Sequence, residues 1–548
     1  MYRLQTLLLV AILVGWMPTI FLWLNPPPLT GDEAYYARVP VEMRERKDWI
    51  VPYFNGEPRY KKPPLMYWFV ALSQAVFGEN ELASRLPSFI AVILTGVLLA
   101  WLGTKMGSSE IGLWAAAAFL LNPMTAILGN WGAPEATLCL FVTASVLWGF
   151  LGFFHNSSSR WHFLSGIAAG MGVLTKGAPG LVLPVIVLLP VAVWKGLEQR
   201  KASGNWNGMM KNIGQIGLWF TISLTVAASW FFAVWLREGE KFWQVFLLRE
   251  HFQRVAEPME GHRGQIWFYL PVIWLLFMPW SICLPQAFAN VLKNFRQTST
   301  TNHSDFDLPM AWWSFSVVAL FSLIATKLPH YIFPAFPAFA WLVALQVQRN
   351  LSKWEFTVGL LLALLPVPLL FYGTFVGTEA YAKFVGKMGF KIGVELDAIR
   401  LATYTLLSGF ASTPLIWCSA TLFADLLGHK KFAEKKVLVL SGSILTIVTL
   451  VAASIAIKAF GSRNAIFMLT KAQNIATFGS DTEWVIFYAK KSVPMLGRDR
   501  ERLQEFLTKH SNAAILARVD FAPILRQEGL TLRRFGIWCV AIQNKQKH

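Results

Sequence analysis

Apolar segments long enough to cross a bilayer recur along most of this 548-residue chain. A transmembrane helix needs about 20 predominantly apolar residues, and about thirteen segments meet that requirement. Only 15% of the residues are charged, whereas a soluble domain has about 25%. The sequence therefore predicts an all-α polytopic membrane protein. The predicted spans are 5–24, 84–104, 109–127, 134–153, 161–175, 178–195, 213–236, 267–290, 310–326, 329–347, 354–376, 402–426 and 436–459.

Positive charge predicts the orientation of these spans. The net charge is +18, and lysine and arginine are concentrated in short, acid-poor loops between alternate spans, as cytoplasmic loops are. This pattern puts the N-terminus inside and the long loops 25–83, 237–266 and 377–401 outside. The first apolar run is too long for a signal peptide and lacks a cleavage site, so we expect it to remain as a span.

A change in composition near residue 460 predicts a second domain. We expect a transmembrane domain at 1–460 and a small soluble α/β domain at 461–548. An odd number of spans would put the second domain outside. The predicted strands are Ala465–Thr470, Trp484–Tyr488, Ala513–Ala517 and Gly536–Ile542, and Asp499–His510 is the predicted helix.

The outer loop 25–83 combines surface helices with acids and bases. Apolar residues recur at helical spacing in 34–48 and 64–78, as in amphipathic helices that lie on a membrane surface. Two carboxylates, Asp32 and Glu33, follow the first span, and the basic run Arg59-Tyr60-Lys61-Lys62 comes later in the loop. Such a combination suits chemistry on a phosphate-bearing lipid, with membrane lipids and no nucleic acid as partners.

Several motifs follow one another along the chain. The motifs in the first outer loop are Asp32-Glu33, Trp49-Ile50-Val51-Pro52, Phe54-Asn55-Gly56, Arg59-Tyr60, Lys62-Pro63 and Tyr67-Trp68. The later motifs are Gly170-Met171-Gly172-Val173-Leu174-Thr175-Lys176-Gly177, Glu250-His251-Phe252-Gln253-Arg254, His262-Arg263 and Lys327-Leu328-Pro329-His330-Tyr331. Taken together, these motifs resemble those of the bacterial aminoarabinose (4-amino-4-deoxy-L-arabinose) lipid A transferases. That family is one of the polyprenyl-phosphate-sugar-dependent glycosyltransferases of the GT-C fold, which include the protein mannosyltransferases.

The resemblance implies a reaction and a location. A sugar, 4-amino-4-deoxy-L-arabinose or a related one, would move with inversion from undecaprenyl phosphate to a lipid A phosphate. The reaction would take place on the periplasmic face of the bacterial inner membrane, with the N-terminus in the cytoplasm and the C-terminal domain in the periplasm. The four cysteines have neither metal nor disulfide spacing. No cofactor is expected. A divalent metal is compatible with the sequence, but no residue pattern indicates one.

The resemblance also assigns roles to acidic residues. Asp32 matches the family's catalytic base or electrostatic centre, and a helix cap is the alternative reading. For Glu33, a role in the catalytic site and a role in structural support are equally expected. Glu135, at the outer start of the fourth span, stands where the family usually has Asp, so its side chain is one methylene longer. Tyr35 also departs from the family, which usually has Arg in this stretch.

Basic residues are assigned to two phosphates. We expect Lys62, Arg59, Lys327 and His330 to bind the donor phosphate, whereas Lys61 fits a membrane anchor better. Lys176 is an interfacial anchor or half of an ion pair within the site. His330 as a metal ligand is not preferred, because no spaced set of ligands accompanies it. The residues expected to bind the acceptor are Arg254, Arg263, His251 and Tyr36.

The choice of acceptor follows from acid–base chemistry. A hydroxyl acceptor needs a base to remove its proton, whereas a phosphate monoester, with a second pKa near about 6, arrives as an anion. The surplus of basic residues favours the phosphate. One alternative is a glycosyltransferase of the same fold that acts on protein or polysaccharide hydroxyls. A second is a lipid-linked sugar transporter or flippase, which should place its charged site near the middle of the membrane.

Overall fold

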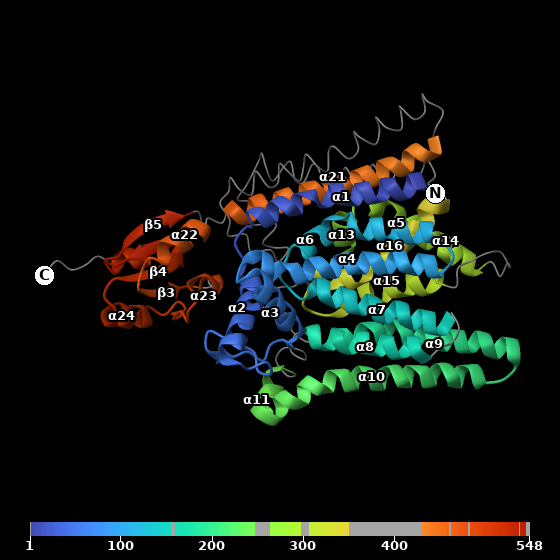
Figure 1. Ribbon diagram of the computed structural model, residues 1–548, viewed down its shortest axis with the longest axis horizontal. Helices are drawn as coiled ribbons and strands as arrows, with labels where there is room; N and C mark the ends of the chain where they lie inside the picture. The colour runs from blue at the N-terminus through green and yellow to red at the C-terminus, as the bar shows by residue number, and fades with distance from the viewer. Residues whose placement is uncertain are drawn as a thin grey trace.

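A computed structural model of the chain consists of a bundle of long helices with a small α/β domain at one end (Figure 1). It describes residues 2–154, 159–246, 264–296, 306–349, 430–459, 462–479, 483–535 and 538–543. The predicted spans 354–376 and 402–426 and the predicted outer loop 377–401 lie outside the described residues.

The helices of the bundle coincide with the other predicted spans. Within the described residues, six helices are long and apolar enough to cross a membrane, or up to eight if each of two bent pairs counts as one span. Apolar runs become helices here because a helix satisfies its own backbone hydrogen bonds in lipid. The bundle contains α1 (Tyr2–Leu24), α4 (Glu81–Lys105), α5 (Ser109–Leu120), α6 (Pro123–Gly129), α7 (Glu135–Phe154), α8 (Ser159–Lys176), α9 (Pro179–Ser203), α10 (Asn207–Glu238), α13 (Tyr269–Leu276), η2 (Trp280–Cys283), α14 (Leu284–Arg296), α15 (Asp307–Leu323), η3 (Pro329–Ala335), α16 (Phe336–Arg349) and α21 (Lys430–Ala459).

Two predicted spans are bent rather than straight. The span predicted at 109–127 divides into α5 and α6, which meet at 68°. Asn122 starts the new helix there, since its side chain accepts a hydrogen bond from the backbone of Thr125 at 3.0 Å, and Pro123 follows it. The span predicted at 267–290 bends by 118° between α13 and the helical turns that follow Pro279, because proline cannot continue the helical hydrogen bonding.

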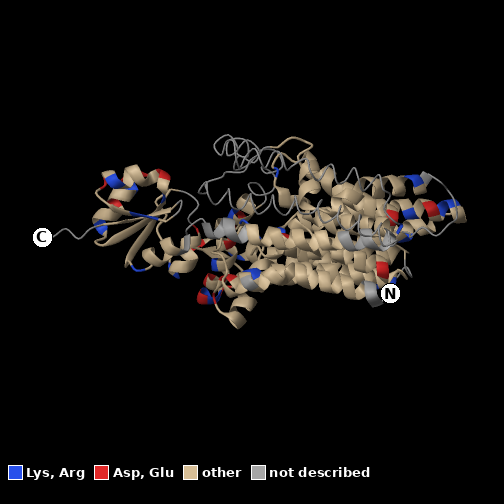
Figure 2. Ribbon diagram, turned by 90° about the horizontal axis from the view of Figure 1, so that it is seen from above, with Lys and Arg blue, Asp and Glu red and all other residues tan. Residues whose placement is uncertain are grey.

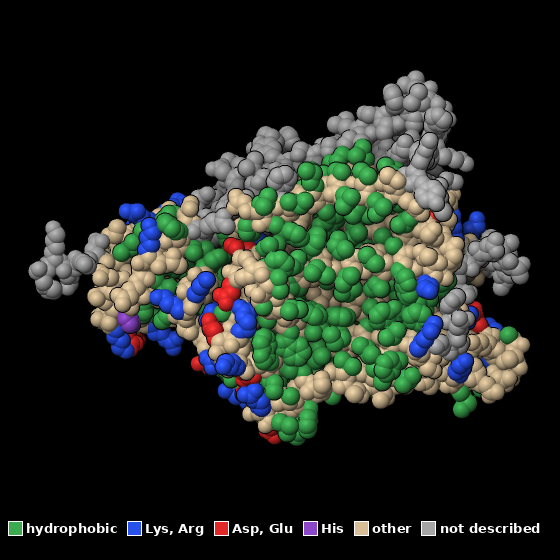
Figure 3. All heavy atoms as spheres, viewed as in Figure 1, with side chains coloured by type: hydrophobic (Ala, Val, Ile, Leu, Met, Phe, Trp, Pro, Cys, Tyr) green, Lys and Arg blue, Asp and Glu red, His purple; other side chains and the backbone are tan. Residues whose placement is uncertain are grey.

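The charge distribution of the bundle is that of a multi-pass membrane protein. Lysine, arginine and the acids gather at the two ends of the helices (Figure 2). Between these ends, hydrophobic side chains cover the face of the bundle in a broad band (Figure 3). Among the exposed apolar residues of the bundle helices are Leu13, Val97 and Phe232, with 71%, 56% and 56% of their area exposed. Such a surface is stable against lipid rather than against water.

Two shorter helices cross the end of the bundle next to the α/β domain. They are α2 (Gly31–Arg46) and α3 (Leu65–Phe77) (Figure 1), and they confirm the helices predicted at 34–48 and 64–78. A small hairpin of β1 (Tyr53–Phe54) and β2 (Glu57–Pro58) lies between them in the sequence. A short helix, α11 (Glu240–Trp243), follows α10.

The C-terminal domain is a four-stranded sheet covered by helices on both faces. Its strand order is β3-β4-β6-β5, with β3 and β4 parallel and the other pairs antiparallel. Side chains of α22 and α23 pack on one face, and side chains of α24 and α25 pack on the other. The elements are α22 (Ser462–Leu469), β3 (Asn474–Phe478), α23 (Trp484–Ala489), α24 (Arg500–Lys509), β4 (Ala513–Arg518), η4 (Val519–Phe521), α25 (Ala522–Gln527), β5 (Thr531–Phe535) and β6 (Trp538–Ile542).

The predictions for this domain were partly wrong. The segments Ala465–Thr470 and Trp484–Tyr488 are helical, not extended, because each short apolar run packs one helical face on the sheet. The predicted helix at Asp499–His510 is confirmed, and Asp499 caps it by accepting hydrogen bonds from two backbone amides. The strands predicted near the C-terminus correspond to β4 and β6, whereas β3 and β5 were not predicted.

Candidate active site

The two adjacent carboxylates at the start of α2 lie in different environments. Asp32 is exposed, whereas Glu33 is fully buried. Successive residues of a helix point about 100° apart, so one carboxylate faces outward while the other faces the bundle. The helix begins there because Thr30 and Glu33 form a reciprocal capping box.

Glu33 joins three parts of the chain. Its carboxylate accepts hydrogen bonds from Arg85 of α4 at 2.7 and 2.9 Å, from the amide of Gly132 at 3.0 Å and from the amide of Thr30 at 2.9 Å. Burial raises the pKa of Glu33, but the Arg85 charge and these hydrogen bonds outweigh burial, so that its pKa lies below the usual range. Arg85 also donates to the carbonyl of Pro27 at 2.8 Å. These contacts fix the start of α2 against the bundle.

Arg59 lies among tyrosines. Its guanidinium carbon is 3.6 Å from the centre of the Tyr35 ring, close enough for a strong cation–π contact. Tyr36 stacks on Tyr67 with the ring centres 5.4 Å apart. The surrounding tyrosines outweigh the effect of burial and raise the pKa of Arg59. The resembling family usually has an arginine in the stretch of Tyr35, and here a guanidinium lies directly over that tyrosine.

Tyr36 of α2 belongs to an apolar cluster that includes Trp131 and Ala133, in the loop just before Glu135. Burial raises the pKa of Tyr36 well above the ordinary value. The negative charges of Glu135 and Asp32 raise it further, and the positive charge of Arg59 opposes them. These charges act on one hydroxyl although they come from α2, α7 and the loop before α3. Asp32, Tyr36, Arg59 and Glu135 therefore lie in one region, because Tyr36 packs beside the residues just before Glu135 and Arg59 lies over Tyr35.

An ionic cluster lies at the start of α7. Lys176, at the end of α8, donates to Oε1 of Glu135 at 2.8 Å, and His330 Nε2 lies 3.5 Å from the same oxygen. The His330 ring contacts Trp131 edge-on, with the ring centres 5.3 Å apart. The other oxygen of Glu135, Oε2, is buried without a hydrogen-bond partner among the residues that the structure describes. An acceptor in this position suits a ligand hydroxyl or ammonium group.

The remaining predicted donor-phosphate residues differ in their surroundings. Lys62 is half-buried on the loop that leads into α3. Lys327 is buried, and its ammonium donates to the carbonyls of Phe321 at 3.0 Å and Ser322 at 2.7 Å and to that of Ile324. Lys327 thus satisfies the open carbonyls at the end of α15, the usual role of a lysine at a helix C-terminus.

Three predicted acceptor-binding residues, His251, Arg254 and Arg263, lie outside the described residues. Within the described part of the chain, no group of three or more His, Cys, Asp and Glu side chains could hold a metal ion.

Some residues of this region were not predicted. Arg85 carried a usable signal, because an arginine inside a predicted span requires a partner, and that partner is Glu33. The sequence predicts either an interfacial anchor or an ion pair for Lys176, and the structure shows the ion pair with Glu135. Glu483 of the C-terminal domain accepts a hydrogen bond from Tyr35, a contact for which the local sequence gives no sign.

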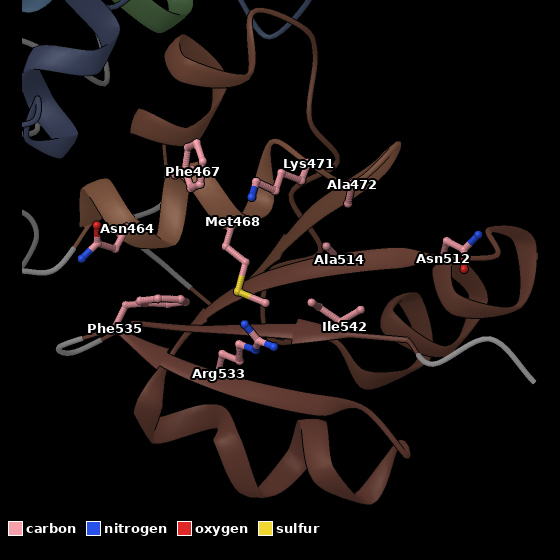
Figure 4. Close-up of a pocket in the computed structure, with 10 residues that line it drawn as sticks. All are labelled: Asn464, Phe467, Met468, Lys471, Ala472, Asn512, Ala514, Arg533, Phe535 and Ile542. Atoms are coloured by element: carbon pink, nitrogen blue, oxygen red, sulfur yellow. The ribbon is translucent and has the colours of Figure 1, made fainter.

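A separate cavity of about 540 Å³ lies on the C-terminal domain, between α22 and the sheet (Figure 4). Lys471 and Arg533 border it together with the apolar side chains of Phe467, Met468 and Phe535. None of the predicted site residues lines it.

Sequence comparisons point to glycosyltransferases. Residues 61–210 match the family model for dolichyl-phosphate-mannose-protein mannosyltransferase. The undecaprenyl phosphate-alpha-4-amino-4-deoxy-L-arabinose arabinosyl transferase of Yersinia pestis (strain Pestoides F) is 31% identical over 320 residues, which are 57% of this chain and 54% of that protein. The enzyme of the same name from Yersinia enterocolitica is 31% identical over 317 residues. The chain thus matches about half the length of these relatives.

Solved structures establish the fold. ArnT from Cupriavidus metallidurans bound to undecaprenyl phosphate is similar with a TM-score of 0.75 and 19% identity, over 99% of this chain and 98% of that one. The archaeal oligosaccharyltransferase AglB from Archaeoglobus fulgidus has a TM-score of 0.52 and 11% identity, over 94% and 69%. The resemblance to the aminoarabinose transferase family, expected from the motifs, is thus confirmed in sequence over 57% of the chain and in fold over 99% of it.

Proposed function

We propose that this protein is a glycosyltransferase that moves a sugar from undecaprenyl phosphate to a lipid A phosphate. The sugar is 4-amino-4-deoxy-L-arabinose or a related one. The observations that carry the proposal are the contact of Arg59 with Tyr35 in α2, the helix of Asp32 and Tyr36, and the adjoining ionic cluster of Glu135, Lys176 and His330. The donor and the sugar are those of the similar enzymes from Yersinia and Cupriavidus metallidurans, as their names give them.

The proposed chemistry is a substitution at the anomeric carbon. An oxygen of the acceptor phosphate forms the new bond to that carbon, and the bond to the donor phosphate oxygen breaks. Undecaprenyl phosphate leaves with the electron pair, and the configuration inverts. Since a phosphate monoester is already ionised near neutral pH, Asp32 needs only to orient it and to stabilise positive charge on the sugar.

Cationic side chains hold the two phosphates in this proposal. Arg59 and Lys62 bind the donor phosphate and stabilise the charge that grows on the leaving oxygen. Lys176 fixes Glu135 beside His330 by its hydrogen bond. Tyr36 meets the acceptor together with the predicted Arg254, Arg263 and His251.

Two predicted site residues take a structural role in the proposal. The carboxylate of Glu33 is occupied by Arg85 and backbone amides, and the ammonium of Lys327 is occupied by the carbonyls at the end of α15. Both residues therefore support the site rather than bind substrate.

We place the active site on the periplasmic side of the inner membrane, with thirteen spans, a cytoplasmic N-terminus and a periplasmic C-terminal domain. Support comes from α4. Its first residue, Glu81, accepts a hydrogen bond from Tyr488 of the C-terminal domain at 2.9 Å. Its last residue, Lys105, lies about 36 Å further along the helix, and a basic residue at this end of a span is typical of the cytoplasmic side. In α3, Leu72 and Val76 are 67% and 68% exposed, which suits a helix resting on lipid.

The same fold could transfer sugar to a protein or polysaccharide hydroxyl. In that case Asp32 would have to act as a base. The transporter alternative is less well supported, because the acids and bases of the candidate site lie at helix ends and in the loops beside them rather than in the middle of spans.

The experiment is to express the chain in a strain that lacks its own lipid A aminoarabinose transferase and to take the mass spectrum of the lipid A. A pentose-amine increment supports the full proposal. A different sugar increment would retain lipid A as acceptor and change the sugar. Unmodified lipid A in a strain that makes the donor and expresses the protein well would refute lipid A as the acceptor.

A further inference from the structure

The C-terminal domain reaches the first turn of α2, the helix that carries Asp32. Glu483, directly before α23, accepts a hydrogen bond from the hydroxyl of Tyr35 at 3.1 Å. Its other carboxylate oxygen would lie 3.7 Å from a Cβ atom added at Gly31. A charged side chain from 448 residues away in the sequence thus lies against the start of the catalytic helix.

Tyr35 also contacts Arg59. Its guanidinium lies over the ring of Tyr35 at 3.6 Å. Its Nε is buried without a hydrogen-bond partner, and no carboxylate forms an ion pair with it among the residues that the structure describes. The ring of Tyr35 therefore holds the cation without neutralising it, which leaves its charge available to an anionic ligand.

We propose that Glu483 is a positioning residue of the donor site. By fixing the hydroxyl of Tyr35, it fixes the ring on which Arg59 stacks, and so the place where the guanidinium meets the donor phosphate. A carboxylate that accepts a hydrogen bond from the phenol hydroxyl also increases the electron density of the ring. This increase strengthens the cation–π contact. The inference rests on the proposed function, since it takes the ligand of Arg59 to be the donor phosphate.

A purely structural reading is that Glu483 only docks the C-terminal domain. Other contacts of the same interface supply the control. Tyr488 donates to Glu81 at 2.9 Å and accepts from the amide of Leu29 at 3.0 Å, in the same interface. Replacing Tyr488 by Phe removes these docking bonds and leaves the hydrogen bond between Tyr35 and Glu483 in place.

The test measures the binding of undecaprenyl phosphate to the purified full-length protein, which requires no turnover. Tyr35→Phe keeps the ring and loses the hydrogen bond, and Glu483→Ala loses the acceptor. We expect each to raise Kd about three- to tenfold, the range of one lost hydrogen bond. Glu483→Gln keeps a neutral acceptor and should recover part of the loss, and Tyr488→Phe should change Kd less than twofold. With turnover, the donor KM should rise more than kcat falls.

A double variant shows whether the effect passes through Arg59. On an Arg59→Lys background, which cannot stack in the same way, Glu483→Ala should add less than twofold. A full additional loss would overturn the inference, as would an equal weakening by Tyr488→Phe or unchanged binding in Glu483→Ala. If the unmodified protein does not bind undecaprenyl phosphate, the proposed function fails with it. If the unmodified protein binds undecaprenyl phosphate and the variants bind it with the same Kd, only the inference about Glu483 fails.

Discussion

Replacing Glu33 by Gln tests whether this buried carboxylate supports the fold or takes part in the reaction. The side chain is fully buried and its partner Arg85 is 4% exposed. Gln keeps the shape but removes the negative charge, and it presents an amide nitrogen to one of the donors around it. Removing one member of a buried ion pair costs about 3–5 kcal/mol, because the other charge is left without a partner.

The structure supports the upper part of this range. Besides two hydrogen bonds from Arg85, the carboxylate accepts from two backbone amides and from the Thr30 hydroxyl at 3.1 Å. We therefore expect Glu33→Gln to lose about 4 kcal/mol of stability. The double variant Glu33→Gln/Arg85→Met should recover much of it, because the unpaired cation is removed as well.

The assay is thermal unfolding of the purified protein in detergent. Unfolding is measured as the decrease in the amount of monodisperse protein with temperature. Glu45→Gln is the matched control. Its carboxylate pairs with Arg38 at 3.0 Å but is 54% exposed, so its loss should cost less than about 1 kcal/mol. If Glu33→Gln were as stable as the unmodified protein and inactive, Glu33 would belong to the chemistry and the structural assignment would be refuted.

The same residue sets a pH dependence. The pKa of Glu33 in the folded protein lies below its ordinary value of 4.5. The folded state therefore favours the ionised form, and this contribution to stability is complete above pH 4.5 and is lost as pH falls through the folded pKa. Between pH 7 and pH 4 the unmodified protein should lose more stability than Glu33→Gln does, and equal losses would contradict this.

Three other outcomes follow from the contacts. Glu135→Gln should reduce transfer about 10- to 100-fold in steady-state assays. Adding Lys176→Met to it should reduce transfer little further, because the two residues act as a pair. Additive losses would show that their roles are independent. Lys327→Met should lower the thermal unfolding temperature through a loss of about 1–3 kcal/mol of stability, and the donor KM should stay within twofold. A large rise in KM with normal stability would instead assign Lys327 to the donor site. A cysteine replacing the exposed Glu501 of α24 should react with a membrane-impermeant maleimide from the periplasmic side, and labelling only from the cytoplasmic side would reverse the topology.

The sequence predicted the described spans well because lipid imposes a simple rule. A run of about 20 apolar residues has few alternatives to a helix. The bend between α5 and α6 was missed, although Asn122 followed by Pro123 is a recognisable start of a helix. In the C-terminal domain, Ala465–Thr470 is too short and too apolar for periodicity to separate strand from helix. Packing on the sheet decides it.

The candidate site was predicted in part. Motifs placed Asp32, Lys62 and Arg59 in one outer loop, and a charge at a span edge marked Glu135. No local pattern could pair Glu135 with Lys176, which are 41 residues apart. Nor could it bring Glu483 to Tyr35. These contacts depend on how helices and domains pack, and that packing is specified by the whole chain rather than by any segment.

The most direct test of the account compares the unmodified protein with Asp32→Asn in the strain that lacks its own transferase, at equal membrane expression. Asparagine keeps the size, and the exposed Asp32 is not part of the capping box that Thr30 forms with Glu33, so folding should be preserved. We predict a pentose-amine increment on lipid A with the unmodified protein and its near-complete loss in Asp32→Asn. An increment of equal intensity in both strains would contradict the central claim, because the chemistry would then not depend on the Asp32 carboxylate.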